Sequence, residues 1–329
     1  MVSSDRQPVS VAQLAVPEMV EVPAHRPAYL RQQFCNVWDI ADGVFGTVLQ
    51  GTHTKTCQTF AIKVVPSLDQ SSKYSNHFEQ ATKIMQLSMT LHPRSLHIVH
   101  VLDCWYETVD DTSSPLTSYP FDINVDDDTE SEIKSFFFAA MEFCTAENLQ
   151  VWLDHRDKLP RIGVDVKLKI NIADGLEYLH AAGIVLGNLN PSNILLTRTE
   201  DGAVIAKIGG YIFDRRSREM CQDSERDMEK YYQSPEMLSP VKPSDIYSLG
   251  VILFSFNIPW RNADGLLSMN VFEQLENFRR GKFPENYPGS EFHKEFLRSM
   301  LRRDPTDRPS IWQVRQFIVS DVPTQQGKN

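Results

Sequence analysis

Residues able to handle a phosphate group stand at three places in the sequence. Gly43 and Gly46 fall in a short turn, where the missing Cβ lets the backbone approach a phosphate closely. Lys63 follows in an apolar, strand-like run and could neutralise that phosphate. An ordinary hairpin turn and a strand lysine reaching water explain the same residues. The third place, residues 184–196, is rich in asparagine, whose amide accepts a hydrogen bond but takes no proton at neutral pH.

The elements that must position these residues change in character along the chain. Short apolar runs at 37–40, 46–49 and 59–65 predict three antiparallel strands, and strand-like pieces follow at 98–107 and 135–143. Beyond residue 147 the apolar spacing becomes helical. We therefore expect an α+β fold with a β-rich N-terminal lobe and a helical C-terminal lobe. The expected helices cover 76–90, 149–153, 166–179, 246–256, 270–280, 292–302 and 310–319, and Ser244 is the expected N-cap of the helix at 246–256.

Composition divides the chain into one large domain with two extensions. Residues 1–33 are rich in Pro, Ser, Val and Gln and predict a mobile arm, and residues 321–329 form a short tail. The domain between them covers 34–320, with an N-lobe at 34–145 and a C-lobe at 146–320. Within the N-lobe, residues 108–134 are an acidic insertion, expected to form a loop.

The charge balance limits the classes of partner. The chain has 33 Lys and Arg against 43 Asp and Glu, a formal net charge of −10. This balance disfavours nucleic acid or an anionic membrane as the main partner. No signal-peptide pattern or run of 18 apolar residues is present in the sequence. The 5 cysteines form no C-x-x-C pair, which argues against zinc and fits a reducing compartment, so we expect a cytoplasmic protein.

Three motifs resemble those of protein kinases. Ala41-Asp-Gly-Val-Phe-Gly-Thr-Val48 is similar to the glycine-rich loop with its first glycine replaced, and Ala61-Ile-Lys63 to the V-A-I-K motif. Residues 184–196 resemble the catalytic loop H-R-D-L-x-P-x-N when anchored on Pro191 and Asn193. The resemblance implies a bilobal protein-kinase-like fold and a residual nucleotide site made of Gly43, Gly46, Lys63 and Asn193.

The same anchoring removes the catalytic groups. Asn188 stands at the catalytic aspartate, Asn190 at the lysine of the loop, and Gly210 at the metal-binding aspartate of D-F-G. Leu186 and Gly187 replace the histidine and arginine. The resemblance therefore implies no catalytic residue, no metal site and no cofactor. The sequence does not decide whether ATP binds without magnesium.

Downstream motifs keep their structural residues. Ser234-Pro-Glu236 resembles A-P-E, and Asp245 opens a run like that of the buried kinase helix whose aspartate holds the catalytic-loop backbone. Arg308, in Asp304-Pro-Thr-Asp-Arg-Pro309, is the usual ion-pair partner of the A-P-E glutamate. These residues are structural in active kinases too, so their presence says nothing about activity.

Within that fold the chain resembles the kinases of translation initiation factor 2 alpha, such as the double-stranded-RNA-activated and haem-regulated enzymes. The run Val101–Glu107, the acidic insertion after it and Phe138–Cys144 follow that family's pattern. Wee-type kinases share the first run and are the second choice. Leu275, Arg279 and Phe283 fall where the family docks its substrate, which implies a partner-binding helix. Helix packing plus one exposed charge explains these three residues as well.

The residues favour a protein that binds rather than catalyses. Met228 and Glu229 replace the glycine and threonine that precede S-P-E in the initiation-factor kinases. We predict a pseudokinase in translation regulation and the stress response, which binds initiation factor 2 alpha as a decoy or pairs with one of its kinases. One alternative is a weakly active or atypical kinase that uses ATP. The other is an inert scaffold that recruits partners through its insertion or arm.

Overall fold

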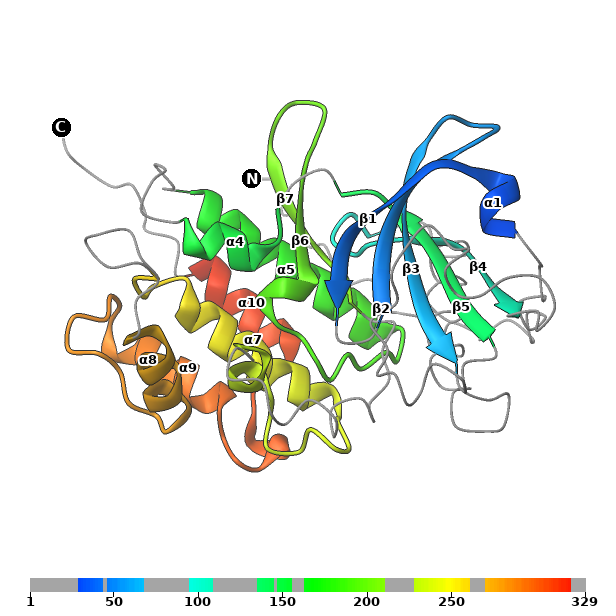
Figure 1. The fold of residues 1–329 in the computed structure, drawn as a ribbon. Helices are drawn as coiled ribbons and strands as arrows, with labels where there is room; N and C mark the ends of the chain where they lie inside the picture. Colours follow the sequence, from blue (N-terminus) through cyan, green and yellow to red (C-terminus); the bar gives the residue numbers. More distant parts are fainter. Residues whose placement is uncertain are drawn as a thin grey trace, which may run out of the picture.

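The computed structural model describes residues 29–43, 46–67, 95–108, 135–144, 147–155, 163–210, 228–260 and 270–320. The predicted helix at 76–90 and tail at 321–329 lie outside the described residues, as do positions 1–28 of the predicted arm and 109–134 of the predicted insertion. A search of the helices in these ranges found none that is both long and apolar enough to cross a membrane. The predicted division into two lobes, one built on a sheet and one helical, is confirmed (Figure 1).

Five antiparallel strands form the sheet of the N-terminal lobe, in the order β1-β2-β3-β5-β4. The five predicted strands are confirmed; β1, β2 and β3 extend beyond their expected ends, whereas β4 begins at Val101 and β5 ends at Glu142. Gly43 pairs with Gly46 where β1 meets β2, so the predicted turn lies at the tip of this hairpin. The bounds are β1 Phe34–Gly43, β2 Gly46–His53, β3 Thr59–Ser67, β4 Val101–Thr108 and β5 Ser135–Glu142.

The alternation of side chains along β5 gives the sheet two buried faces. Phe136 and Phe138 pack on the outer face, while Phe137 between them joins the core shared with the C-terminal helices. On the outer face, the ring of Trp105 stacks between Phe138 at 5.1 Å and Phe34 at 6.1 Å. Each such ring stabilises the fold by about 1.5–3 kcal/mol through burial. Alternate side chains of β5 are therefore buried on opposite faces of the sheet, as the two-residue repeat of a strand requires.

A short helix, α1 (Tyr29–Gln33), covers the outer face of the sheet. The backbone N–H of Leu30 and the indole Nε1 of Trp105 both donate to Oε1 of Glu107, each at 2.8 Å. Leu30 itself is buried. The prediction that a mobile arm extends to residue 33 is therefore wrong for residues 29–33, because an apolar contact and a buried carboxylate fix this turn.

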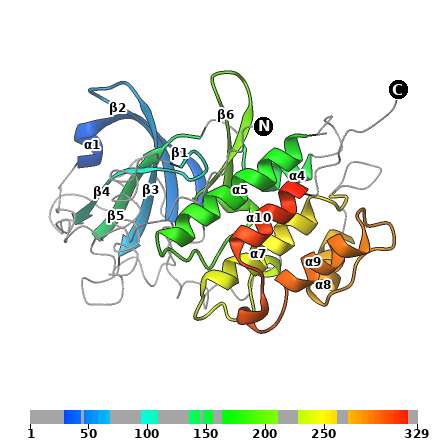
Figure 2. The same ribbon diagram turned by 180° about the vertical axis from the view of Figure 1, so that it is seen from behind.

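Helices α5 (Val164–Ala181), α7 (Lys242–Ser255) and α10 (Ile311–Ser320) form the centre of the C-terminal lobe (Figure 2). The smaller helices surround them: α4 (Leu149–Asp154), α8 (Asn270–Arg279) and α9 (Glu291–Met300). All six confirm predicted helices. The hairpin β6–β7 (Ile194–Arg198 and Val204–Ile208) was not predicted, because its two strands have only five residues each.

The start of α7 differs from the prediction. The helix begins at Lys242, so Ser244 is its third residue and not its N-cap. The Ser244 hydroxyl accepts a hydrogen bond from the backbone N–H of Val241 at 2.9 Å and donates to Glu236 Oε1 at 2.7 Å. Ser244 therefore accepts a hydrogen bond from a backbone N–H at the start of the helix, as an N-cap does, but it does so from within the first turn.

The segment before β4 ties the two lobes together. The backbone N–H of Ile208 in β7 donates to the His97 carbonyl at 2.9 Å, and Val99 N–H donates back to Ile208 at 2.8 Å. Gly175 of α5 lies against the same carbonyl, since an added Cβ would stand 2.4 Å from it. Lys207 and Glu142 add an ion pair of 2.7 Å between β7 and β5. The lobes therefore share hydrogen bonds as well as a core.

Glu107→Ala should destabilise the protein by about 2–4 kcal/mol, because the buried Leu30 and Trp105 donors lose a charged acceptor. Glu107→Gln should cost less, since it keeps one acceptor oxygen. Urea unfolding followed by tryptophan fluorescence measures both. Glu273→Ala, on the exposed face of α8, is the matched control. Equal midpoints for Glu107→Ala and this control would contradict the role of Glu107.

Candidate functional site

Asp245, in the first turn of α7, holds the loop at 184–196 in place. Its Oδ1 accepts the backbone N–H of Gly187 at 2.7 Å, and its Oδ2 accepts the backbone N–H of Leu186 at 3.0 Å. The imidazole Nε2 of His180, at the end of α5, lies 2.8 Å from the same Oδ2. Asp245 is fully buried, and a carboxylate there is stable only when donors surround it. The structural role implied for Asp245 is confirmed.

Three asparagines tie this loop to itself. Asn190 Nδ2 and Asn193 Nδ2 both donate to the Asn188 carbonyl, at 3.0 and 3.2 Å. Asn190 Oδ1 in turn accepts the backbone N–H groups of Ser192 and Asn193 and caps a 3₁₀ turn at 191–193. The predicted residues do lie together. Their amides are engaged with the backbone of the loop.

Gly210 closes the other side of this cluster. Asn188 Nδ2 donates to the Gly210 carbonyl at 3.3 Å, and Gly209 N–H donates to the Asn193 carbonyl at 2.8 Å. Gly210 has φ +71°, a conformation that strains any residue with a Cβ. An added Cβ would also lie 2.5 Å from Cγ and Oδ1 of Asn193.

The magnesium that the kinase fold uses with its nucleotide does not fit these residues. Gly210 has no ligand atom, and Asn188 and Asn193 are neutral amides, whereas Mg²⁺ binds through carboxylates and phosphates. The backbone around Gly210 also leaves no room for an aspartate side chain while Asn193 keeps its position. The departure from the kinase pattern is therefore built into the packing of the loop.

Lys63, the residue expected to meet the phosphates, lies in β3 opposite Val48 of β2 and Ala139 of β5. Its side chain is half-buried. Burial lowers the pKa of Lys63 to about 8, although the carboxylate of Glu229 opposes the shift. Of the remaining nucleotide residues, Gly43 and Gly46 flank the hairpin tip, whose residues 44–45 lie outside the described ranges.

Glu229 was not predicted as part of the site. It lies in a short 3₁₀ helix of the C-terminal lobe, η4 (Met228–Tyr232), and its charge acts on Lys63 in the N-terminal lobe. The sequence carried one signal for it, an acidic residue at the position of the family's threonine.

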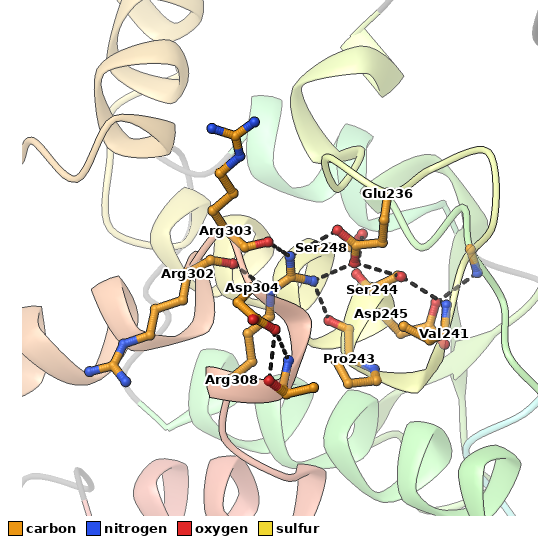
Figure 3. Close-up of polar contacts among 12 residues, drawn as sticks. Glu236, Val241, Pro243, Ser244, Asp245, Ser248, Arg302, Arg303, Asp304 and Arg308 are labelled. Atoms are coloured by element: carbon orange, nitrogen blue, oxygen red, sulfur yellow. Dashed lines mark hydrogen bonds and ion pairs between the residues drawn. The ribbon is translucent and has the colours of Figure 1, made fainter.

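Glu236 and Arg308 form a bidentate ion pair (Figure 3). The two guanidinium nitrogens donate to the two carboxylate oxygens at 2.5 and 2.9 Å. Arg308 also donates to the carbonyls of Pro243 and Arg302, both at 2.8 Å. Burial alone would raise the pKa of Glu236, but hydrogen bonds from Arg308 and Ser244 outweigh it and lower the pKa to about 2. The predicted pairing is confirmed.

The predicted partner-binding residues do not form a surface. Leu275 is fully buried, and Phe283 packs among the rings of Phe254, Phe278 and Tyr287. The prediction that Leu275 contacts a partner is therefore wrong, because this residue is part of the core beneath α8. Phe283 is partly buried and packs against the same core. Arg279 has 27% of its side chain exposed.

Glu236→Gln should lower stability most near pH 7, because the wild-type carboxylate stays ionised and paired down to a pKa of about 2. The contribution of an acid with a lowered folded pKa is full above the unfolded value of about 4.5 and is lost as the pH falls from there towards 2. Urea midpoints of wild type and variant should therefore converge between pH 5 and pH 2. Glu273→Gln, on exposed α8, is the matched control. A constant difference at every pH would contradict this account.

Gly210→Ala should destabilise the protein by more than the about 1–3 kcal/mol that a non-glycine residue costs at positive φ. The matched control is Gly202→Ala, at φ +81° with nothing within 4 Å of the added Cβ. The control measures backbone strain alone, and the excess loss at Gly210 measures the conflict with Asn193. Chemical denaturation gives both values. Equal losses would show that Asn193 moves away freely.

Comparisons with known proteins agree with this geometry. The chain matches the family described as protein kinase domain over residues 36–318. "Eukaryotic translation initiation factor 2-alpha kinase 3" of Bos taurus is 30% identical over 202 residues, which cover 54% of this chain and 17% of the relative. "Interferon-induced, double-stranded RNA-activated protein kinase" of Mus musculus is 27% identical over 305 residues, covering 88% of this chain and 52% of the relative. "Serine/threonine-protein kinase stk11" of Xenopus laevis is 29% identical over 194 residues, covering 56% and 43%.

The chain thus spans about half or less of the length of these curated relatives. The matches confirm the predicted resemblance to the kinases of initiation factor 2 alpha. Because the family match covers most of the sequence and the described residues have the two-lobed fold, this chain belongs to the protein kinase domain family.

Proposed function

We propose that this chain is a pseudokinase that acts by binding protein and modulates signalling by the initiation factor 2 alpha kinases. The observation that carries the proposal is the cluster of Asn188, Asn193 and Gly210. There, uncharged amides and a glycine occupy the places of the base and the metal ligand, and they hydrogen-bond to one another. Packing at Gly210 also resists the return of a carboxylate.

The chemistry of phosphoryl transfer supports the loss of activity. A general base contributes about 10²–10⁴-fold to such a reaction, and Asn188 cannot take a proton. Losing the carboxylate that positions the metal removes several kcal/mol of charge stabilisation. Kinases turn over at about 1–100 s⁻¹, so two losses of this size leave little useful rate. Among the residues that the structure describes, none stands where it could act as the base or the metal ligand of the reaction.

The expectation for nucleotide binding is separate from the expectation for catalysis. The interaction of Lys63 with Glu229 supplies this lysine with an internal counter-charge, which triphosphate oxygens would have to replace. We propose that no magnesium–nucleotide complex is a cofactor here. Binding of ATP without magnesium is the expectation of the alternative function, a weakly active or atypical kinase, for which Lys63 and Asn193 would supply the contacts.

The partner follows from the family. Because relatives of this chain are named as kinases of initiation factor 2 alpha, we propose that it binds this factor or one of its kinases in the cytoplasm. As a decoy for the factor it would lower signalling, and as a partner of a kinase it could change output in either direction. A scaffold that works through residues 109–134 or the N-terminal arm is the second candidate.

The purified chain should incorporate no radiolabelled phosphate into itself or into the initiation-factor alpha subunit above the background of Lys63→Ala. Asn188→Asp should not restore transfer, because Gly210 still supplies no metal ligand. An active initiation-factor kinase is the positive control. Incorporation that disappears in Lys63→Ala would overturn the pseudokinase proposal.

A pull-down tests the partner separately. The alpha subunit and its kinases are offered together as competing preys, to wild type and to a chain that lacks residues 110–134. We expect capture of one of these preys by both chains. Capture that is lost with the insertion would favour the scaffold, and capture of no prey would overturn the pathway while leaving the fold assignment intact.

A further inference from the structure

A groove of about 530 Å³ lies between η4, the turn that follows it and helix α8. Its wall carries Lys230 and Tyr231 from η4, Met237 from the turn, Glu276 and Arg279 from α8, and Arg280, which directly follows α8. The structure describes all of these residues, and they lie in the helical lobe (Figure 1). Of the three predicted partner-binding residues, Arg279 lines the groove, and Leu275 and Phe283 are not part of its wall.

The groove is basic on an acidic protein. Three cations, Lys230, Arg279 and Arg280, face one carboxylate, Glu276, which leaves a net charge of +2 within a chain of −10. Glu276 is shared, since its Oε1 lies 3.0 Å from Arg280 and its Oε2 3.4 Å from Arg279. Such exposed pairs contribute only about 0–1 kcal/mol, so an incoming carboxylate can compete for these guanidinium groups.

The groove also contains a positioned donor and an apolar surface. Arg279 is anchored, because its Nε donates to Tyr247 Oη at 3.2 Å and its terminal nitrogen donates to the Gln233 carbonyl at 3.4 Å. Arg280, with 66% of its side chain exposed, and Lys230, above the ring of Tyr231 at 5.4 Å, form the rim. The rings of Tyr231 and Phe272 are 5.7 Å apart and supply apolar area beside the charges.

We propose that this groove binds an extended, carboxylate-rich peptide segment of a partner protein. The inference deepens the proposed function, because it assigns partner recognition to a specific surface. An anchored guanidinium can hold one carboxylate bidentately, while the two rim cations accept carboxylates on either side. Apolar side chains between the acidic residues can pack on Tyr231 and Met237. A basic segment would be repelled by the three cations.

The test uses a fluorescein-labelled peptide with the sequence of residues 119–132, which contains six acidic residues and no basic one. A peptide with every Asp and Glu changed to Asn and Gln is the neutral probe. Fluorescence anisotropy is measured with the full chain. It is repeated with a chain whose acidic residues at 110–132 are neutralised, so that the protein's own insertion cannot mask the groove.

The acidic probe should bind at least one of these chains and weaken by about tenfold between 50 and 300 mM salt. Lys230→Glu with Arg280→Glu should weaken binding at least tenfold, and Lys230→Gln with Arg280→Gln by an intermediate factor. The charge-matched control is Arg302→Glu with Arg303→Glu, two exposed arginines outside the groove, which should bind like wild type. Circular dichroism confirms that each variant is folded.

Three results would overturn the inference: no binding of the acidic probe to either chain, equal binding of the neutral probe, or unchanged affinity in the groove variants. Binding of the probe to the chain with a neutralised insertion alone would support the groove and identify its own insertion as a competitor. Phosphate incorporation by the chain would overturn the pseudokinase proposal but leave this result standing, so the two failures are distinguishable.

Discussion

The buried carboxylate of Asp245 is the interaction on which the rest of the site depends. It gathers donors from two separate segments, the imidazole of His180 and the backbone N–H groups of Leu186 and Gly187. A fully buried carboxylate tolerates no missing donor, so it fixes all three positions together. Gly187 accommodates the loop at φ +71° with little strain. From that anchor the chain continues directly into the asparagine cluster.

The difference between the retained and the lost residues follows from what they contact. Asp245 binds backbone N–H groups and Glu236 pairs with Arg308, so the removal of any of them would leave a buried charge or donor without its partner. A catalytic base and a metal ligand contribute to the reaction and little to folding. At Asn188 and Gly210 the side-chain amide donates to the backbone carbonyl. The residues that stabilise the fold are therefore different from those at the positions of the catalytic groups.

The sequence predicted elements whose pattern is local and missed features that depend on distant contacts. The strand β5 and the helix α7 were identified because each is a nearly continuous apolar run. The packing of Phe283 could not be read in this way, because it depends on the ring of Phe254, which lies in another helix.

The same reason explains the error at α1. Its single turn is held by Glu107, which lies 77 positions away from Leu30, and no local signal announces that contact. The catalytic-loop cluster was predictable in membership, since the motif fixes the order of Asn188, Asn190 and Asn193. Its hydrogen bonds were not, because they require the backbone conformation of Gly210.

Lys63 and Glu229 have opposite effects on an anion that approaches them. A half-buried lysine with a pKa of about 8 is still mostly charged at neutral pH, so it continues to attract an anion. In a kinase that anion is a phosphate accompanied by a metal. Here a carboxylate of the chain already acts on the lysine, and an entering phosphate would meet it as a like charge with no cation to screen the repulsion. Lys63 and Glu229 would therefore act on an entering phosphate in opposite directions.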